Sequence, residues 1–292
     1  MRRISVYQVD AFTDRPLAGN PAGVVWDAAE LADDTMQAVA RELNCSETVF
    51  VLPPTDPTAQ LHFRFFTPVR EVPLCGHATV AACHLGVELG ELIPAVYRLQ
   101  TAAGMLGVDI RSAAEGCFLH QAPPRFRSLE LPPARLAAVL GLTTADIAPS
   151  PALASTGLWH LLVPLVSTEA LDRAAPDLEQ LGRLNAKLGA DTTHLFCLGA
   201  IPAAPIQMRD FAPQCGVRED PQTGTAAGAM AAWLAHAGLV ALPARLLAEQ
   251  GRQMGRPGRL FIELDGSDGE PRSVRVGGTA VTVLSGQLAL PD

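Results

Sequence analysis

The sequence predicts an α+β fold of mainly antiparallel sheet, divided into two similar domains. Short segments with alternating apolar and polar residues are typical of half-buried strands. They mix with helical segments without a regular strand–helix–strand rhythm, and no G-x-G-x-x-G motif opens a helix, which argues against a doubly wound Rossmann sheet. A set of landmarks also occurs twice in the 292-residue chain, and this length suits two domains with substantial cores.

The first elements follow from local periodicity. Residues 4–11, 61–65 and 97–101 alternate with a period of two and are predicted to be strands. Apolar residues at i, i+3, i+4 and i+7 follow Asp33 and Asp34, so we expect an amphipathic helix that these two acidic residues cap.

The chain repeats its landmarks in the same order. The first copy has the segments 19–25, 46–50 and 64–68 and a glycine turn at Gly76, and the second has 157–163, 192–196, 209–213 and a turn at Gly224. Chance similarity between apolar segments is the alternative. The shared order favours two domains of the same topology.

The repeat suggests where the domains begin and end. We expect the first domain to comprise residues 1–125 with a return strand at 278–292, and the second to comprise residues 126–277. The proline-rich segment 123–133 is the candidate linker. Because small ligands often bind between domains, the two glycine turns are expected to face one cleft.

Composition excludes several partners and locations. The formal net charge of −8 provides no counter-charge for a phosphate backbone or an anionic membrane, so we expect neither nucleic acid nor membrane as a partner. The first residues lack the apolar region of a signal peptide, and a cytoplasmic location is therefore expected. Residues 223–244 carry no formal charge, but they are rich in Ala and Gly and predict a helix buried within the protein rather than a membrane span.

Residue counts exclude several kinds of catalysis. Lys187 is the single lysine and lies off the apolar stripe of a predicted helix, so pyridoxal, Schiff-base and P-loop chemistry are not expected. The 6 cysteines form no C-x-x-C pair, and no metal-ligand spacing joins them to the 7 histidines. We therefore predict no metal site.

Glu47 directly precedes a strongly apolar segment that we expect to be a buried strand. A carboxylate there loses hydration, which suits it to proton transfer. A glutamate exposed at the edge of a strand is the alternative that the local sequence leaves open.

Cys75, Gly76 and His77 open a predicted helix of small residues. The free N–H groups and the dipole at such a helix N-terminus favour a carboxylate or a phosphate. His77 is placed to donate to that anion or to shuttle a proton, and a structural histidine is the alternative.

Asp220, Gly224 and Thr225 occupy the corresponding place in the second copy, before another predicted buried helix. Asp220 is the candidate second acid or base, although a residue that caps the helix would look the same. If both helix N-termini point into one cleft, together they form an anion site.

Taken together, these motifs closely resemble the phenazine-biosynthesis isomerase family, the PhzF-like proteins, over nearly the whole chain. The matching motifs are VDAFT at 9–13, GNP at 19–21, SET at 46–48, CGHAT at 75–79 and EDPQTGTA at 219–226. The resemblance implies a diaminopimelate-epimerase-like fold, in which two pseudo-symmetric domains each wrap a β-barrel-like sheet around a central helix. It also implies a homodimer.

The same resemblance implies a site and a reaction. Glu47 matches the glutamate that moves a proton within a small carboxylated substrate, without cofactor or metal, and His77 and Asp220 complete the catalytic set. The matched substrate-binding residues are Asn20, Ser46, Gly76, Gly224 and Thr225. Thr225 stands where the family often has serine, and it keeps the hydroxyl group.

Two further functions stay open as hypotheses. The first is a cofactor-independent amino-acid racemase or epimerase, and the second is a non-catalytic binding protein with the same fold. Racemases of this fold use two facing cysteines. Cys75 matches the first of them, but Asp220 stands near the place of the second, which disfavours a two-thiol mechanism. The physiological substrate does not follow from the sequence.

Overall fold

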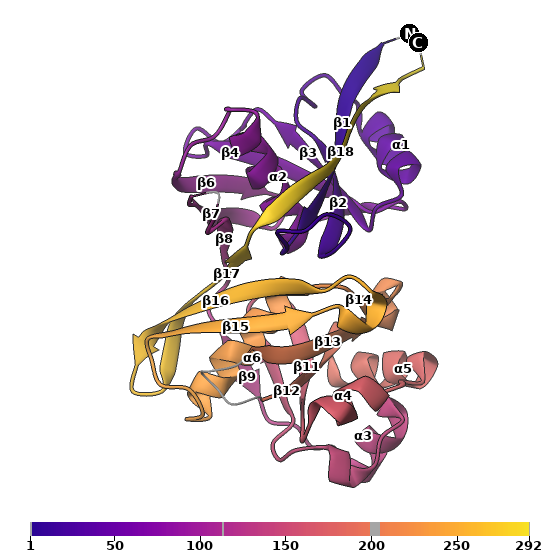
Figure 1. Cartoon of the computed structure of the whole chain (residues 1–292), viewed down its shortest axis with the longest axis vertical. Helices are drawn as coiled ribbons and strands as arrows, with labels where there is room; N and C mark the ends of the chain where they lie inside the picture. Colours follow the sequence, from indigo (N-terminus) through magenta and orange to yellow (C-terminus); the bar gives the residue numbers. More distant parts are fainter. Residues whose placement is uncertain (1, 113, 199–204, 292) are drawn as a thin grey trace. The chain divides into compact units, whose positions relative to one another are not determined.

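In the computed structural model, which describes residues 2–112, 114–198 and 205–291, the chain forms two units (Figure 1). The first comprises Met1–His120 and Gly277–Asp292, and the second comprises Gln121–Val276. The ends of the chain meet in the first unit, where the backbone N–H of Leu290 donates to the carbonyl of Arg2 at 2.8 Å.

The first unit wraps a mostly antiparallel sheet around one helix. Its elements are β1 (Arg3–Ala11), β2 (Asn20–Val25), α1 (Asp33–Leu43), β3 (Glu47–Leu52), β4 (Leu61–Phe66), β5 (Glu71–Val72), α2 (Gly76–Glu88), β6 (Ala95–Thr101), β7 (Gly104–Ile110), β8 (Cys117–His120) and β18 (Ala280–Ala289). Strand β1 pairs antiparallel with β2 and β18, β2 runs parallel to β3, and β4 pairs antiparallel with β3 and parallel to β6.

The second unit has the same plan. Its elements are β9 (Arg125–Arg127), α3 (Pro133–Leu140), β10 (Ala152–Ser155), β11 (Trp159–Leu165), α4 (Thr168–Arg173), α5 (Leu178–Leu188), β12 (Thr192–Cys197), β13 (Ile206–Ala212), β14 (Val217–Asp220), α6 (Gly224–His236), β15 (Ala244–Gln250), β16 (Gly258–Ser267) and β17 (Glu270–Gly278). Short 3₁₀ turns lie at Thr144–Asp146, Pro213–Cys215 and Arg252–Met254.

Strand pairing in the two units follows one pattern. In the first, β2 is parallel to β3, β3 antiparallel to β4 and β4 parallel to β6. In the second, β11 is parallel to β12, β12 antiparallel to β13 and β13 parallel to β15. The shared topology, with one helix inside each sheet, confirms the predicted α+β fold of two similar barrel-like domains.

Helices α2 and α6 are the central helices, and their composition explains their position. Both are built mainly from small residues, without a formal charge from Gly76 to Leu85 or from Gly224 to Ala235, so strands can pack closely on every side. Residues 226–235 of α6 are all buried, as predicted. Among the helices that the structure describes, none is long and apolar enough to cross a membrane.

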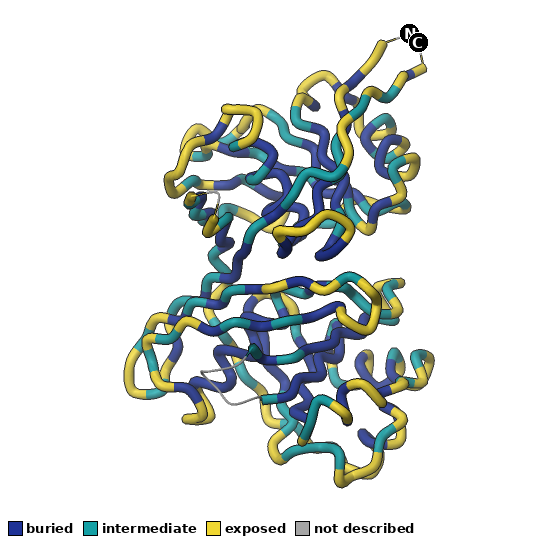
Figure 2. The backbone as a smooth tube through the Cα atoms, viewed as in Figure 1, coloured by how far each residue is buried: buried dark blue, intermediate teal, exposed yellow. Residues whose placement is uncertain are grey.

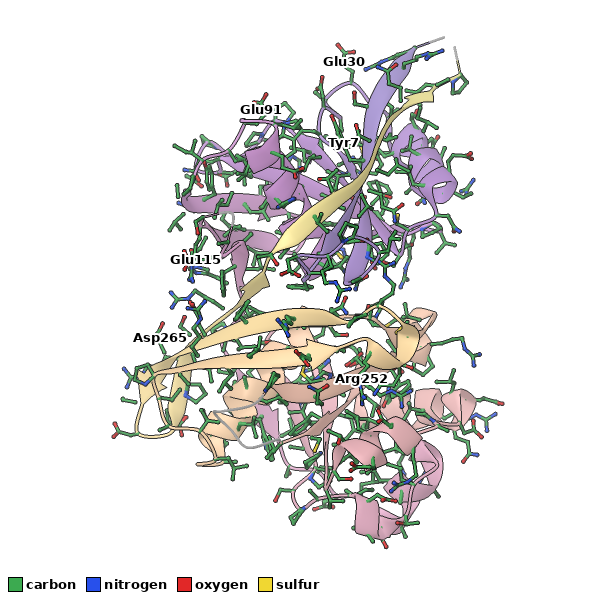
Figure 3. All side chains as sticks on the ribbon, viewed as in Figure 1. Tyr7, Glu30, Glu91, Glu115, Arg252 and Asp265 are labelled. Atoms are coloured by element: carbon green, nitrogen blue, oxygen red, sulfur yellow. The ribbon has the colours of Figure 1, made fainter. Side chains whose placement is uncertain are left out.

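The outer helices cover the opposite face of each sheet. In the first unit, Met36 and Val39 of α1 pack with Phe50 and Phe66. In the second, α3, α4 and α5 close a larger core that includes Leu161 of β11. Exposed residues concentrate in loops and at strand ends (Figure 2). Charged side chains such as Glu30, Glu91 and Asp265 are exposed (Figure 3).

Most local predictions are confirmed and one needs correction. The strands predicted at 4–11, 61–65 and 97–101 are β1, β4 and β6. The N-cap of α1 is Ala32, which has no side-chain acceptor, because the helix begins at Asp33 and both aspartates therefore lie in its first turn. The Asp33 carboxylate accepts a hydrogen bond from Arg64 Nη1 at 2.6 Å. The proline-rich segment 123–133 begins just after the division between the units at His120/Gln121, and its residues Arg125–Arg127 form β9 and pair with β10.

Candidate active site

Parallel pairing of β2 and β3 brings three of the predicted residues to one edge of the first sheet. Ala22 is the register partner of Glu47, so Asn20 at the start of β2 and Ser46 just before β3 lie at the same end of the two strands. Asn20 and the following strand are buried, which fixes this edge rigidly against the core.

The N-terminus of α2 reaches this edge. Cys75 is the N-cap with an extended backbone (φ −144°, ψ 118°), and its carbonyl accepts bonds from the backbone N–H and the hydroxyl of Thr79 at 3.1 and 2.7 Å. A Cβ atom added to Gly76 would meet no atom within 4 Å. The first turn of α2 therefore presents open space beside its N–H groups, where an anionic group can approach.

His77 lies at the centre of the polar contacts. Its Nε2 is 3.3 Å from Glu47 Oε2 and 3.3 Å from Ser46 Oγ. On the other side of the ring, Nδ1 is 3.3 Å from Cys75 Sγ. One imidazole ring thus connects a carboxylate, a hydroxyl and a thiol that come from two separate elements.

The residues of this group differ in their exposure to solvent. His77 is 7% exposed and Cys75 8%, whereas the Glu47 side chain is 20% exposed and Ser46 is exposed. The thiol is therefore the inner end of the contacts and the carboxylate is the outer end. Of the three ionisable groups, Glu47 is the one best placed to meet a small molecule from solution.

Burial also lowers the pKa of His77, and the nearby Glu47 carboxylate opposes this effect only in part. A neutral ring carries one N–H. If Nε2 carries it, it donates to the Glu47 carboxylate, and Nδ1 accepts from the Cys75 thiol. This arrangement holds the carboxylate in place and makes the ring a path for a proton.

Comparison with known proteins identifies the family. The sequence pattern of the family described as phenazine biosynthesis-like protein (PhzC-PhzF) matches residues 9–286. The chain belongs to this family.

Characterised and uncharacterised members resemble it over their full length. The uncharacterised isomerase YfhB of Bacillus subtilis (strain 168) is 37% identical over 96% of this chain and 97% of its own. The trans-2,3-dihydro-3-hydroxyanthranilate isomerase of Pseudomonas chlororaphis is 31% identical over 97% of this chain and 98% of its own. The crystal structure of the Bacillus anthracis PhzF-family protein matches with a TM-score of 0.89 and 31% identity, covering 99% of this chain and 100% of that one. The PhzF-like chain is thus an isomerase by family.

The remaining predicted residues of this PhzF-like isomerase lie at the start of α6. Thr223 is the N-cap, so Asp220 is not, and Thr223 Oγ1 donates to Asp220 Oδ2 at 2.6 Å. The carbonyl of Gly224 accepts from Gln121 Nε2 at 2.9 Å, and that of Thr225 accepts from Thr156 Oγ1 at 3.1 Å. These bonds fix the first turn of α6 within its own unit.

Sequence reasoning missed part of this arrangement. Gln121 and Thr156 bond to each other at 2.6 Å and brace the α6 N-terminus, but no motif marks either residue. It placed Glu47 and His77 in one catalytic set, as their contact bears out, but it did not place the Cys75 thiol against the His77 ring. The ligand atoms of these three residues all lie within 4.8 Å of one another, although no metal-ligand spacing appears along the chain.

Proposed function

We propose that this PhzF-like isomerase moves a proton within a small carboxylated substrate, with Glu47 as the acid and base and without a cofactor. The observation that carries the proposal is the contact of Glu47 Oε2 with His77 Nε2 at 3.3 Å, at the solvent-facing end of an otherwise buried group. Proton transfer by a positioned carboxylate requires such a fixed, partly exposed side chain.

The reaction then balances without any other reagent. Glu47 takes a proton from one carbon of the substrate and returns it to another, while the double bond shifts between them. His77 holds the carboxylate, and its ring can exchange a proton with it between the two steps. The N–H groups at Gly76 and His77 supply the donors for the substrate carboxylate.

The proposed site also includes residues of the second unit. By the family resemblance, Asp220 is the second catalytic group, and Asn20, Ser46, Gly76, Gly224 and Thr225 hold the substrate. We predict that residues of both units bind the same substrate molecule. This prediction is supported by the similar position of the two groups at the N-termini of α2 and α6. An Asp220→Asn enzyme that keeps full turnover would refute Asp220's share in it.

Solvent deuterium incorporation tests the function. The enzyme is incubated in D₂O with trans-2,3-dihydro-3-hydroxyanthranilate, the compound in the name of the Pseudomonas relative, and with cyclic and linear amino acids. An isomerase places deuterium on a carbon other than the one that lost the proton. No label and no product from any compound, together with tight binding of one of them, would instead indicate a binding protein.

A racemase is the second candidate, because Cys75 Sγ lies 3.3 Å from His77 Nδ1 and a thiol paired with an imidazole can transfer a proton. Racemisation would place deuterium on the carbon that lost the proton and invert its configuration. The position of the label therefore separates the two reactions.

We also propose that the enzyme acts as a homodimer, and that neither nucleic acid nor membrane is a partner. The net charge of −8 supports the second point. Light scattering on the purified protein measures the first, and a monomer over the whole micromolar range would contradict it.

A further inference from the structure

The side chain of Gln250, the last residue of β15, binds the turn that leads from β14 into α6. This side chain belongs to a residue that is only 2% exposed. Its Nε2 donates to the carbonyl of Asp220 at 2.8 Å and to Thr223 Oγ1 at 3.2 Å. Its Oε1 accepts from the backbone N–H of Thr223 at 3.3 Å. One buried amide thus bonds through both of its ends to the segment between Asp220 and the N-cap of α6.

These contacts fix the direction of the hydrogen bonds. A backbone N–H only donates and a carbonyl only accepts, so the Gln250 amide fits in one orientation. Its nitrogen therefore donates to the Thr223 hydroxyl oxygen, and the single hydroxyl hydrogen of Thr223 is left for Asp220 Oδ2 at 2.6 Å. The donors run from Gln250 through Thr223 and end on the Asp220 carboxylate, which they hold in one orientation.

Gln250 is itself held by its neighbours. Gln222, which is 1% exposed, donates from Nε2 to the carbonyl of Gln250 at 3.1 Å and to that of Arg256 at 2.8 Å. Gly251 lies between them with φ 87°, and a Cβ atom there would be 2.3 Å from the Arg256 carbonyl oxygen, so only glycine fits. Buried hydrogen bonds of this kind make a rigid network, and the Gln250 amide is therefore in place before a substrate binds.

The first unit uses the equivalent position in another way. Thr101 and Gln250 are the last residues of β6 and β15, the strands that run parallel to β4 and β13. The Thr101 hydroxyl donates to the carbonyl of Gly104 at 3.0 Å and accepts from the N–H of Ala103 at 3.2 Å, within its own turn. The same barrel plan thus forms with this side chain bonded locally. A brace from this position to the central helix is a feature of the unit that carries Asp220.

We propose that Gln250 and Thr223 are positioning residues for Asp220, and that they hold its carboxylate in the orientation that catalysis uses. The inference rests on the proposed function, in which Asp220 is the second catalytic group. Neither Gln250 nor Thr223 has to touch the substrate in this role. Their loss should therefore lower kcat and leave KM nearly unchanged, because the carboxylate is still present but no longer held in place.

Threonine variants of the full-length enzyme test the role of the hydroxyl, with trans-2,3-dihydro-3-hydroxyanthranilate in D₂O as the probe. Thr223→Val keeps the shape of the side chain but removes the donor, and it should lower kcat by about 10-fold or more, the loss expected for one hydrogen bond to a charged group. Thr223→Ser restores the hydroxyl and should restore most of kcat. Thr101→Val, the matched change in the first unit, should leave kcat unchanged. A Thr223→Val enzyme with wild-type kcat, or a Thr223→Ser enzyme as slow as Thr223→Val, refutes the proposal.

A double variant tests whether Gln250 acts through Thr223. Gln250→Met should lower kcat at least as much as Thr223→Val does. Adding Thr223→Val to Gln250→Met should then cost little more, because both residues act through the same bond to Asp220. Losses that multiply would show two independent effects and overturn the shared role. If thermal unfolding shows that Gln250→Met does not fold, the Thr223 variants decide.

Crystal structures of the wild type and of Thr223→Val decide the point without any turnover. The Asp220 carboxylate should leave its wild-type rotamer in Thr223→Val and keep it in Thr223→Ser. A carboxylate that stays in place in Thr223→Val overturns the inference, even if activity falls. If the carboxylate turns as expected but the wild-type enzyme labels no compound, the positioning by Gln250 and Thr223 stands and the proposed reaction fails.

Discussion

Glu47 and Thr192 occupy the same position in the two units. Each is the first residue of its strand, β3 or β12, and each is the register partner of a residue on a neighbouring parallel strand, Ala22 for Glu47 and His160 for Thr192. The residues that follow them, Thr48 and Thr193, pair with Phe66 and Phe211. The sequence analysis aligned residues 46–50 with 192–196 and so matched Ser46 with Thr192. The strand register instead matches Glu47 with Thr192, which shifts this part of the alignment by one residue.

The second unit uses this position differently. Thr192 Oγ1 donates to Asp210 Oδ2 at 2.9 Å and lies 2.8 Å from His160 Nδ1, and His194 Nδ1 lies 2.9 Å from the same carboxylate oxygen. His160, His194 and Asp210 are completely buried. The carboxylate of the second unit is therefore sealed inside the protein, whereas Glu47 faces solution. This contrast supports Glu47 as the base.

Glu47→Gln should lower turnover by about 10²- to 10⁴-fold, because it keeps the size and the hydrogen bonding of the side chain but removes the group that accepts the proton. Turnover is measured as deuterium incorporation into the substrate. Cys75→Ala should cost much less, and Glu42→Gln, which changes an exposed glutamate of α1, should cost nothing.

A thiol mechanism reverses the order of these effects. Cys75→Ala would then be inactive, and iodoacetamide would block the wild-type enzyme. Thermal unfolding of each variant is compared first, since loss of folding would imitate loss of chemistry. A folded Glu47→Gln enzyme with wild-type turnover contradicts the mechanism.

Removal of metal should leave turnover intact. The proposed reaction needs only the acid and base groups of the protein, so enzyme dialysed against EDTA should match untreated enzyme. Turnover that disappears with EDTA and returns with stoichiometric Zn²⁺ would make the ion a catalytic group and contradict this expectation.

The protein should lose stability in mild acid because of His160. Burial lowers the pKa of His160 to about 4 in the folded state, from 6.5. Between these values the unfolded chain binds a proton that the folded chain does not. The neutral His160 therefore contributes fully to the free energy of unfolding above pH 6.5. This contribution, at most about 3 kcal/mol, is lost as the pH drops towards 4. The lowered pKa of His77 acts in the same direction.

Urea unfolding at pH 7 and pH 5 measures this loss. His160→Asn keeps a donor for Thr192 but does not titrate, so its stability should fall less between the two pH values than that of the wild type. His236→Asn changes a histidine whose side chain is 44% exposed and should leave the difference unchanged. Equal losses in His160→Asn and the wild type would refute the assignment.

An Arg–Glu pair recurs in both units and should matter more in the second. Arg209 Nε donates to Glu219 Oε1 at 2.8 Å, and Arg64 Nε donates to Glu71 Oε1 at 2.7 Å. The side chains of Arg209 and Glu219 are 9% and 17% exposed, against 20% and 35% for Arg64 and Glu71. Arg64 also keeps a second partner in Asp33 at 2.6 Å.

Glu219→Ala should therefore lower the free energy of unfolding by about 3–5 kcal/mol, because it leaves a buried guanidinium without its carboxylate. Glu71→Ala should lower it by about 1 kcal/mol or less. Urea unfolding of the two variants gives the comparison, and a larger effect of Glu71→Ala would contradict it.

The sequence by itself determined the fold class and named much of the candidate site. Strand alternation is a local signal, since neighbouring side chains point to opposite faces, and it located β1, β4 and β6. Small uncharged residues marked α2 and α6 as the buried helices. Ordered motifs identified Glu47 and His77 without any knowledge of their distance.

Tertiary structure alone decided which of these groups touch. Glu47 and His77 lie 30 residues apart in sequence, and only the packing of the α2 N-terminus against the start of β3 sets their atoms 3.3 Å apart with Cys75 beside them. The same holds for His160 and Asp210, whose hydrogen bonds to Thr192 run between neighbouring strands. Such contacts depend on strand register, and a shift of one residue turns a side chain to the other face of the sheet. No local pattern in the sequence records that register.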